Sequence, residues 1–199
     1  MSSLSTITPA RLPLTVAQLK AHARITHDEE DDLVAAYLEA ATEDVAAFLG
    51  RAIGETAYRL TLDRWPDGDC PVLLPRPPVQ SIDAVQYLDT SGAWQSIDPA
   101  GLQQDLVGAP ARLLPAVGET WPDTQQGAVA AVRIDFTAGD DLAVPHRALQ
   151  AIRMQAAGLF EFREDLQADS VRALPGGTRR LLTGLRFRSR ELTRFLAHH

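Results

Sequence analysis

A histidine and five acidic residues occupy six consecutive positions early in the chain, and together they could bind a metal. The six residues are His27, Asp28, Glu29, Glu30, Asp31 and Asp32. If this stretch is helical, His27 and Asp31 lie four residues apart on one side, where an imidazole and carboxylates can hold a divalent cation. One hypothesis is therefore a small metal-dependent enzyme or nuclease that uses His27, Asp28, Asp31 and Asp32.

The same run also fits the electrostatic start of a helix. Acidic side chains in the first turn stabilise a helix by about 0.3–1 kcal/mol each, because unpaired amides and the positive end of the dipole lie there. Apolar residues follow at steps of three and four from Leu33 to Phe48, and Gly50 stands where a C-terminal glycine is favoured. Further metal ligands are missing nearby, so we favour the structural interpretation and predict no metal.

The usual enzyme signatures are absent from the sequence. Lys20 is the single lysine and does not follow a glycine, which excludes a P-loop, and the motifs of serine hydrolases, zinc proteases and dinucleotide-binding folds are missing. Cys70 is the single cysteine, so one chain cannot build a disulfide framework or a thiolate zinc site. The sequence therefore predicts a protein without catalytic residues or a cofactor.

The acidic run must be positioned by helices, and the hydrophobic periodicity predicts three of them. They span about 15–23, 29–49 and 145–166. Thr15 precedes Gln18 by three residues, the spacing of a capping box, and Pro145 suits a first helical position.

Between the long helices the period changes to two, as in half-buried strands. Tyr58, Leu60 and Leu62 alternate with polar residues, and the segment from Val79 to Ile97 has a four-residue turn that indicates a hairpin. We therefore expect a small antiparallel β region over about 56–137.

The fold class expected from these elements is α+β. We predict a mainly helical core, made of two long helices and a short N-terminal helix, with a small antiparallel β insertion and an extended C-terminal arm. The main domain would span residues 13–166, and a basic arm residues 167–199.

The arm differs from the rest of the chain in charge. Residues 1–169 have a net charge of −13, whereas residues 170–199 contain seven arginines and one glutamate, a net charge of +6. Interleaved leucines and phenylalanines indicate docking on an acidic, partly apolar surface, or a path for nucleic acid. The candidate partner-binding residues are Arg179, Arg180, Leu181, Leu182, Leu185, Arg186, Phe187, Arg188, Arg190 and Arg194.

Three segments taken together resemble a known family. They are "LTVAQLKAHARITHDEEDDLVAAYLEAATEDVAAFLGR", "LPRPPVQSIDAVQYLDTSGAWQSI" and "DFTAGDDLAVPHRALQAIRMQAAGLFEFRED". In this order, over about residues 13–166, they look like the head-tail connector (adaptor) proteins of long-tailed bacteriophages and of the related gene transfer agents. The last thirty residues carry no motif of that family.

The resemblance implies a structural protein of a virion or virus-like particle. Members of the family form a ring at the head-tail junction, between the portal protein and a stopper or other tail-side protein. The resemblance also implies about twelve copies, passage of double-stranded DNA through the ring without sequence-specific contact, and assembly in the bacterial cytoplasm. Portal contact by the basic arm is a further prediction. A stopper or tail-completion protein of the same assembly is the alternative.

Overall fold

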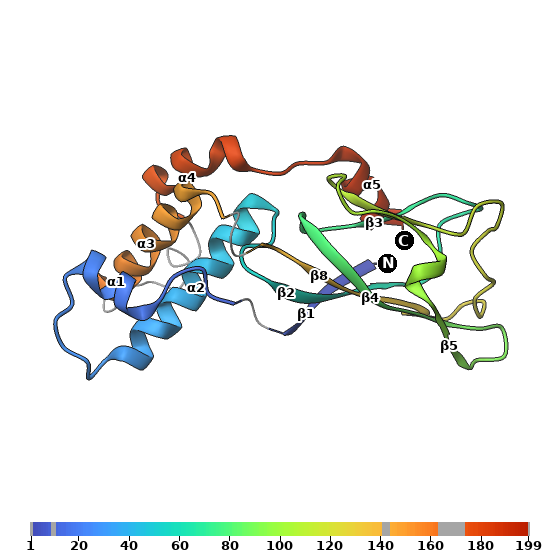
Figure 1. The fold of residues 1–199 in the computed structure, drawn as a ribbon, viewed down its shortest axis with the longest axis horizontal. Helices are drawn as coiled ribbons and strands as arrows, with labels where there is room; N and C mark the ends of the chain where they lie inside the picture. Colours follow the sequence, from blue (N-terminus) through green and yellow to red (C-terminus); the bar gives the residue numbers. More distant parts are fainter. Residues whose placement is uncertain (1, 9–10, 141–143, 163–173, 199) are drawn as a thin grey trace. The chain divides into compact units, whose positions relative to one another are not determined.

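The computed structural model of the protein describes residues 2–8, 11–140, 144–162 and 174–198. The chain forms two compact units (Figure 1). The β unit comprises Met1–Ala10, Glu55–Asp140 and Arg188–His199, and the helical unit comprises Arg11–Gly54 and Asp141–Phe187. Each unit therefore contains segments that are distant in the sequence.

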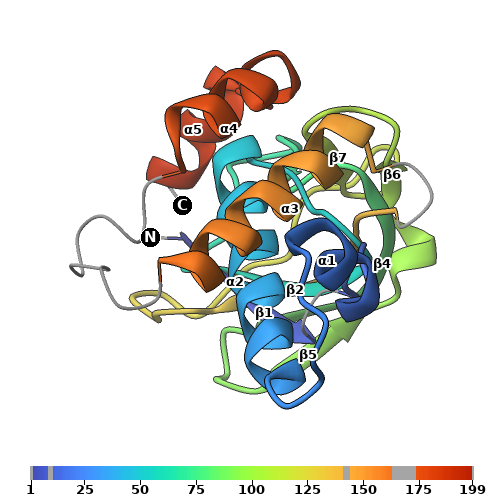
Figure 2. The same cartoon turned by 90° about the vertical axis from the view of Figure 1, so that its left-hand side faces the viewer.

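The helical unit is built around two long helices. Its elements are α1 (Val16–Ala23), α2 (Asp31–Leu49), α3 (His146–Glu161), α4 (Gly176–Leu182) and the 3-10 turn η2 (Thr183–Leu185). α2 packs against α3, and α1 and α4 each contact α3 as well (Figure 2). Fully buried residues such as Leu38, Val45 and Ile152 fill the space between these helices. Their spacing places one apolar stripe of each helix in this core.

Local signals set the ends of the first two helices, as the sequence predicts. The Thr15 hydroxyl accepts from the Gln18 amide at 3.2 Å, and the Gln18 side chain accepts from the Thr15 amide at 3.0 Å, which completes the capping box. Gly50 ends α2 with φ of +66°. A Cβ at that position would lie 3.0 Å from the Phe187 carbonyl oxygen, so glycine is required for both its conformation and its size.

The β unit contains two antiparallel sheets. The five-stranded sheet has the order β1 (Ser2–Thr8), β2 (Thr56–Leu62), β8 (Val132–Ala138), β4 (Val79–Leu88) and β5 (Trp94–Ile97). The three-stranded sheet has the order β3 (Val72–Leu74), β7 (Ala111–Leu114) and β6 (Gln103–Asp105). A 3-10 turn, η1 (Pro99–Gly101), precedes β6. All pairings are antiparallel, so the sheets need no helical crossover.

The register of the central strands follows from their two-residue period. Tyr58 lies opposite Phe136, and their rings stack with centroids 5.7 Å apart. On the other face, the Arg59 guanidinium donates two 2.7 Å hydrogen bonds to the Asp135 carboxylate. A shift of one residue would exchange these two faces, so burial of the rings fixes the register.

A single carboxylate organises the turn between β4 and β5. Asp89 Oδ1 accepts from the amides of Ser91 at 2.9 Å and Ala93 at 3.0 Å, and Oδ2 accepts from the Gln95 side chain at 2.8 Å. Hydrogen bonds from Ser91 and then Gln95 hold the pKa of Asp89 well below its usual range. The ionised carboxylate therefore fixes the hairpin that the sequence predicts for this segment.

The last helix, α5 (Arg190–His198), belongs to the β unit. It contacts β1 and β3, and its Leu196 carbonyl accepts a 2.7 Å hydrogen bond from the Ser2 hydroxyl. Phe195 is buried in this unit, with 8% of its surface exposed. The two ends of the chain therefore meet within one unit.

The α+β class is correct, but the expectation of a mainly helical core with a small β insertion is wrong. The described residues contain eight strands in two antiparallel sheets, and these strands form a unit distinct from the helical one, so the core is not mainly helical with a small β insertion. Two strands were not expected. β1 is a short polar segment whose partner residues in β2 lie about fifty to sixty positions later in the sequence, and β3 has only three residues, so neither shows a local pattern.

The expectation of an extended C-terminal arm is also wrong. Where the structure describes it, this segment forms α4, η2 and α5. Its apolar residues are too few for a separate core, but Leu174 and Leu182 join the core of the helical unit, and Phe195 is buried in the β unit. Contacts that are distant in sequence thus supply the folding energy that the segment lacks. Residues 163–166 of the predicted third helix and 167–173 of the predicted arm lie outside the described residues.

The predicted connector domain over 13–166, followed by a separate arm, remains a prediction. None of the helices within the described ranges is long and apolar enough to span a membrane.

Candidate functional site

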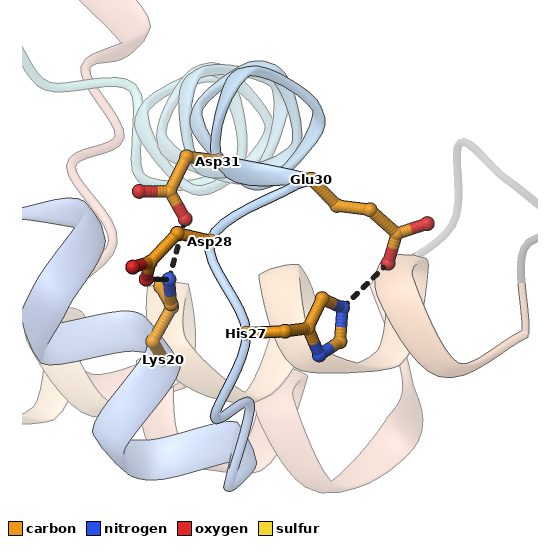
Figure 3. A network of polar contacts seen from close by, with 5 residues as sticks. All are labelled: Lys20, His27, Asp28, Glu30 and Asp31. Carbon is orange, nitrogen blue, oxygen red and sulfur yellow. Dashed lines mark hydrogen bonds and ion pairs between the residues drawn. The ribbon is translucent and has the colours of Figure 1, made fainter.

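The acidic run lies where α1 and α2 meet, and a lysine is at its centre (Figure 3). Lys20 projects from α1, and its Nζ lies 2.5 Å from Asp28 Oδ1 and 2.5 Å from Asp31 Oδ1. His27 Nε2 lies 3.1 Å from Glu30 Oε2. Two of the acidic residues therefore form a clamp on Lys20, and a third pairs with the neighbouring imidazole.

This clamp shifts the acid–base properties of its members. The hydrogen bond from Lys20 holds the pKa of Asp28 below its usual value, and the hydrogen bonds to Asp28 and then Asp31 raise the pKa of Lys20. Lys20 is only 9% exposed. A lysine this covered keeps its charge because it is paired, so the clamp fastens α1 to the start of α2.

This arrangement gives no support to a metal site. α2 begins at Asp31, so His27 precedes the helix and does not share a helical face with Asp31. Asp31 and Asp32 occupy the first turn, as the dipole argument predicts. In the part of the chain that the structure describes, no three His, Cys, Asp or Glu side chains are placed to hold a metal ion.

Replacing Lys20 by methionine is expected to lower the melting temperature of the helical unit by several degrees near neutral pH. The methionine retains an unbranched apolar stem but leaves two carboxylates without their cation. Because the pKa of Asp28 is lowered from its ordinary 3.8, the stabilisation is present above that value and disappears as the pH falls through the folded-state pKa. The pKa of Lys20 is raised above its ordinary 10.5, so the stabilisation is also lost at alkaline pH, as the pH rises through the folded-state pKa of Lys20.

Thermal unfolding followed by circular dichroism from pH 2 to 8 tests this prediction, with Lys20→Arg as the charge-retaining control. The melting temperatures of Lys20→Met and the native chain should converge at acid pH. An equal deficit at every pH would show that packing, and not the clamp, is lost.

The basic C-terminal segment divides into buried apolar and exposed charged residues. Leu182 has no exposed surface and lies in the core of the helical unit, and Leu185 packs against this core. Leu181 and Phe187 are half-buried. The exposed arginines of the predicted set are Arg179, Arg180, Arg186, Arg188 and Arg194. Arg190 begins α5.

Two contacts fix the segment after α4 to the end of α2. The Phe187 amide donates a 2.7 Å hydrogen bond to the Leu49 carbonyl, and the Arg186 guanidinium lies 5.1 Å from the centre of the Phe48 ring. Such a cation–π contact contributes about 0.5–1 kcal/mol at an exposed site. The structure therefore holds Leu182, Leu185 and Phe187 on their own chain and leaves the arginine charges outward.

The exposed arginines are suited to binding anions. Arg179, Arg180, Arg188 and Arg194 make no ion pair with any of the described residues. A guanidinium presents a planar set of donors that matches a carboxylate or phosphate with two hydrogen bonds. Because the set is split between the two units, α4 offers Arg179 and Arg180, and the β unit offers Arg188 and Arg194.

Sequence reasoning did not single out three exposed valines in loops of the β unit. Val107, Val117 and Val129 are 99%, 86% and 81% exposed. Isolated exposed valines are common, so they identify no site by themselves.

Comparisons with known proteins give matches of two kinds. Residues 13–87 match the family model described as phage gp6-like head-tail connector protein. The fold matches a chain in a structure of the neck of an empty GTA particle computed with C6 symmetry, with 28% identity and a TM-score of 0.73, covering 94% of this chain and 96% of that chain. It also matches a chain of the virion of a native gene transfer agent (GTA) particle, with 28% identity, a TM-score of 0.72 and the same coverage.

A third similar structure is the neck of a native GTA particle computed with C12 symmetry, with 29% identity, a TM-score of 0.67 and coverage of 94% and 96%. No curated protein matches the chain.

Proposed function

We infer that the chain is a head-tail connector of a phage-like particle, because it matches that family over residues 13–87 and, along nearly its whole length, chains of gene transfer agent necks and virions. The near-complete coverage by neck structures is the observation that carries this conclusion. The resemblance predicted from the sequence is thereby confirmed. The chain is a structural component of the particle neck.

The finer parts of this function are proposals. The chain assembles into a ring of about twelve copies, with the portal protein on one side and a stopper or other tail-side protein on the other. Two of the similar structures were computed with sixfold and twelvefold symmetry, which supports a ring. The chain acts without catalysis, and it is assembled in the bacterial cytoplasm.

Passage of DNA through the ring is supported by the charge of the β unit. The β unit contains thirteen acidic and eight basic side chains, a net charge of −5, to which residues 55–140 contribute −7. A channel wall of this sign repels phosphates, so double-stranded DNA slides past it and does not bind. The interaction is independent of base sequence.

The basic C-terminal segment is the proposed portal contact. Its exposed arginines can pair with carboxylates of a partner, while Leu182 and Phe187 hold the segment on its own chain. Of the predicted set, the contact residues are therefore the arginines, and the leucines position them.

A charge reversal of Arg179, Arg180, Arg186 and Arg188 to glutamate should block attachment of the chain to portal-bearing heads. The isolated chain should still fold, because the contact of Arg186 with Phe48 that the reversal removes contributes only about 0.5–1 kcal/mol. Losing several charge-assisted pairs is expected to weaken attachment by about tenfold or more. Co-sedimentation with DNA-filled heads measures attachment, and circular dichroism checks the fold.

A matched pair of double variants makes the comparison specific. Arg179→Glu with Arg180→Glu changes two exposed residues of α4, whereas Arg64→Glu with Arg147→Glu changes two exposed arginines elsewhere by the same total charge. Only the first pair should reduce attachment. Normal tailed particles from the fourfold variant would reject the portal contact, and a location outside the neck in electron micrographs would reject the connector function itself.

A further inference from the structure

Both edges of the five-stranded sheet lack the usual protection against pairing with another chain. β1 forms one edge and β5 the other. β1 has the sequence SSLSTIT, with five exposed and two half-buried residues, and β5 has the sequence WQSI, with three exposed and one half-buried residue. Neither strand contains a charged residue or a proline, the groups with which monomeric proteins commonly block an edge.

The edge strands of the three-stranded sheet differ from these in burial and charge. All three residues of β3 are buried, and α5 contacts this strand as it also contacts β1. β6 ends in Asp105, which is paired with Arg112. Where α5 contacts β1, the Leu196 carbonyl accepts from the Ser2 hydroxyl, but five of the seven residues of β1 and three of the four residues of β5 remain exposed.

The backbone groups on these two edges have no partner strand. Within the described ranges, β1 is hydrogen-bonded as a strand only to β2, and β5 only to β4. No other backbone hydrogen bond from residues 2–8 or 94–97 is present in the described structure. Each edge thus presents a row of amide and carbonyl groups that a second strand can pair with.

We propose that β5 of one copy pairs with β1 of the next copy, so that the five-stranded sheets join into one continuous sheet around the ring. This inference rests on the proposed ring function. It adds the interface by which neighbouring subunits recognise each other. Main-chain hydrogen bonds would hold the two strands together. Side chains such as Ile7 and Trp94, which are 48% and 42% exposed, would become more buried at this interface.

A second copy is the occupant that these edges fit best. A closed ring of identical subunits needs two different, mutually complementary surfaces on every chain, because each subunit contacts one neighbour on each side. The two edges of one sheet are two such surfaces. Both are uncharged, so their approach meets no like-charge repulsion. The C6 and C12 symmetry of the similar neck structures is the symmetry that a repeated joint of this kind produces.

Cysteine cross-linking in assembled particles tests the pairing. Cys70 is exposed and free, so it is first replaced by serine. Two double variants, Ser5→Cys with Ser96→Cys and Thr6→Cys with Ser96→Cys, then place one thiol on each edge. Two versions are needed because neighbouring residues of a strand point to opposite faces. A short bismaleimide is added to purified particles, and the chain is detected on denaturing gels.

The expected result is a ladder of multimers above the dimer from at least one double variant, with each single variant remaining monomeric. If single Ser5→Cys or single Ser96→Cys gives dimers, like edges meet and the proposed pairing is wrong. If the chain is in the particle neck but neither double variant cross-links, the pairing is wrong while the connector function stands. Absence of the chain from particles overturns both.

Discussion

Leu182→Ala is expected to destabilise the helical unit by about 2–5 kcal/mol, the range for removing a buried leucine side chain and leaving a cavity. Leu182 is fully buried in the core formed with α2 and α3, and its helix, α4, contacts α3. Urea denaturation followed by circular dichroism measures the loss. Hydrogen exchange locates it, because the amides of α3 and α4 should lose protection first.

Leu181→Ala is the matched control, since this neighbour is half-buried and lies outside that core. It should cost about 1 kcal/mol or less. Equal, small effects of both substitutions would mean that α4 is not part of the helical core. In that case the basic segment would be free to leave its own chain, and the leucines, besides the arginines, would become candidates for the portal contact.

Phe136→Ala is expected to destabilise the β unit by about 3–5 kcal/mol, because a fully buried aromatic ring is removed from the centre of the five-stranded sheet. The ring also stacks on Tyr58, a contact that contributes about 0.5–1.5 kcal/mol beyond the buried area. Denaturation followed by tryptophan fluorescence reports on this unit, because Trp65, Trp94 and Trp121 all lie in it.

Val129→Ala serves as the control for this substitution. Val129 is 81% exposed, so its truncation should change stability by about 0.5 kcal/mol or less. A Phe136→Ala variant as stable as that control would contradict the register that places Phe136 opposite Tyr58. Hydrogen exchange of α2 and α3 should change little in Phe136→Ala if the helical unit retains its own core.

These two substitutions also bear on assembly. Phe136 lies in β8, two strands from either free edge of the sheet, so Phe136→Ala should reduce ring formation only through the loss of folded β unit. Leu182→Ala should reduce attachment to the head by displacing Arg179 and Arg180. A comparison of folded fraction and attachment in the same samples separates the two effects.

The local elements with a strong hydrophobic period could be predicted well. α1 and α2 begin and end where Thr15, the acidic run and Gly50 indicate, because these signals act within a few residues. The central strand pattern from Tyr58 to Leu62 could be read for the same reason. The family resemblance extended this reading to a particle component, and the comparisons confirmed it.

Features that depend on distant partners could not be predicted. The acidic run consists of residue types that can bind a metal, yet two of its carboxylates, Asp28 and Asp31, form ion pairs with Lys20. Only the packing of α1 on α2 brings that lysine close to them. β1 has no apolar stripe of its own and becomes a strand because β2 offers it an edge. The sequence pattern predicts that the leucines of the basic segment contact a partner, whereas Leu182 is buried in the core of the helical unit.

The sequence by itself determined the periodic elements, the charge of the C-terminal segment and the family resemblance, because each depends on residue types at short spacing. Only the tertiary structure decided that the strands form a unit of their own, that the described part of the C-terminal segment is helical, and that β1 and β5 are the edge strands of their sheet. The physical reason is that burial and strand pairing are set by which segments meet, and segments as far apart as β1 and α5 meet only when the chain is folded.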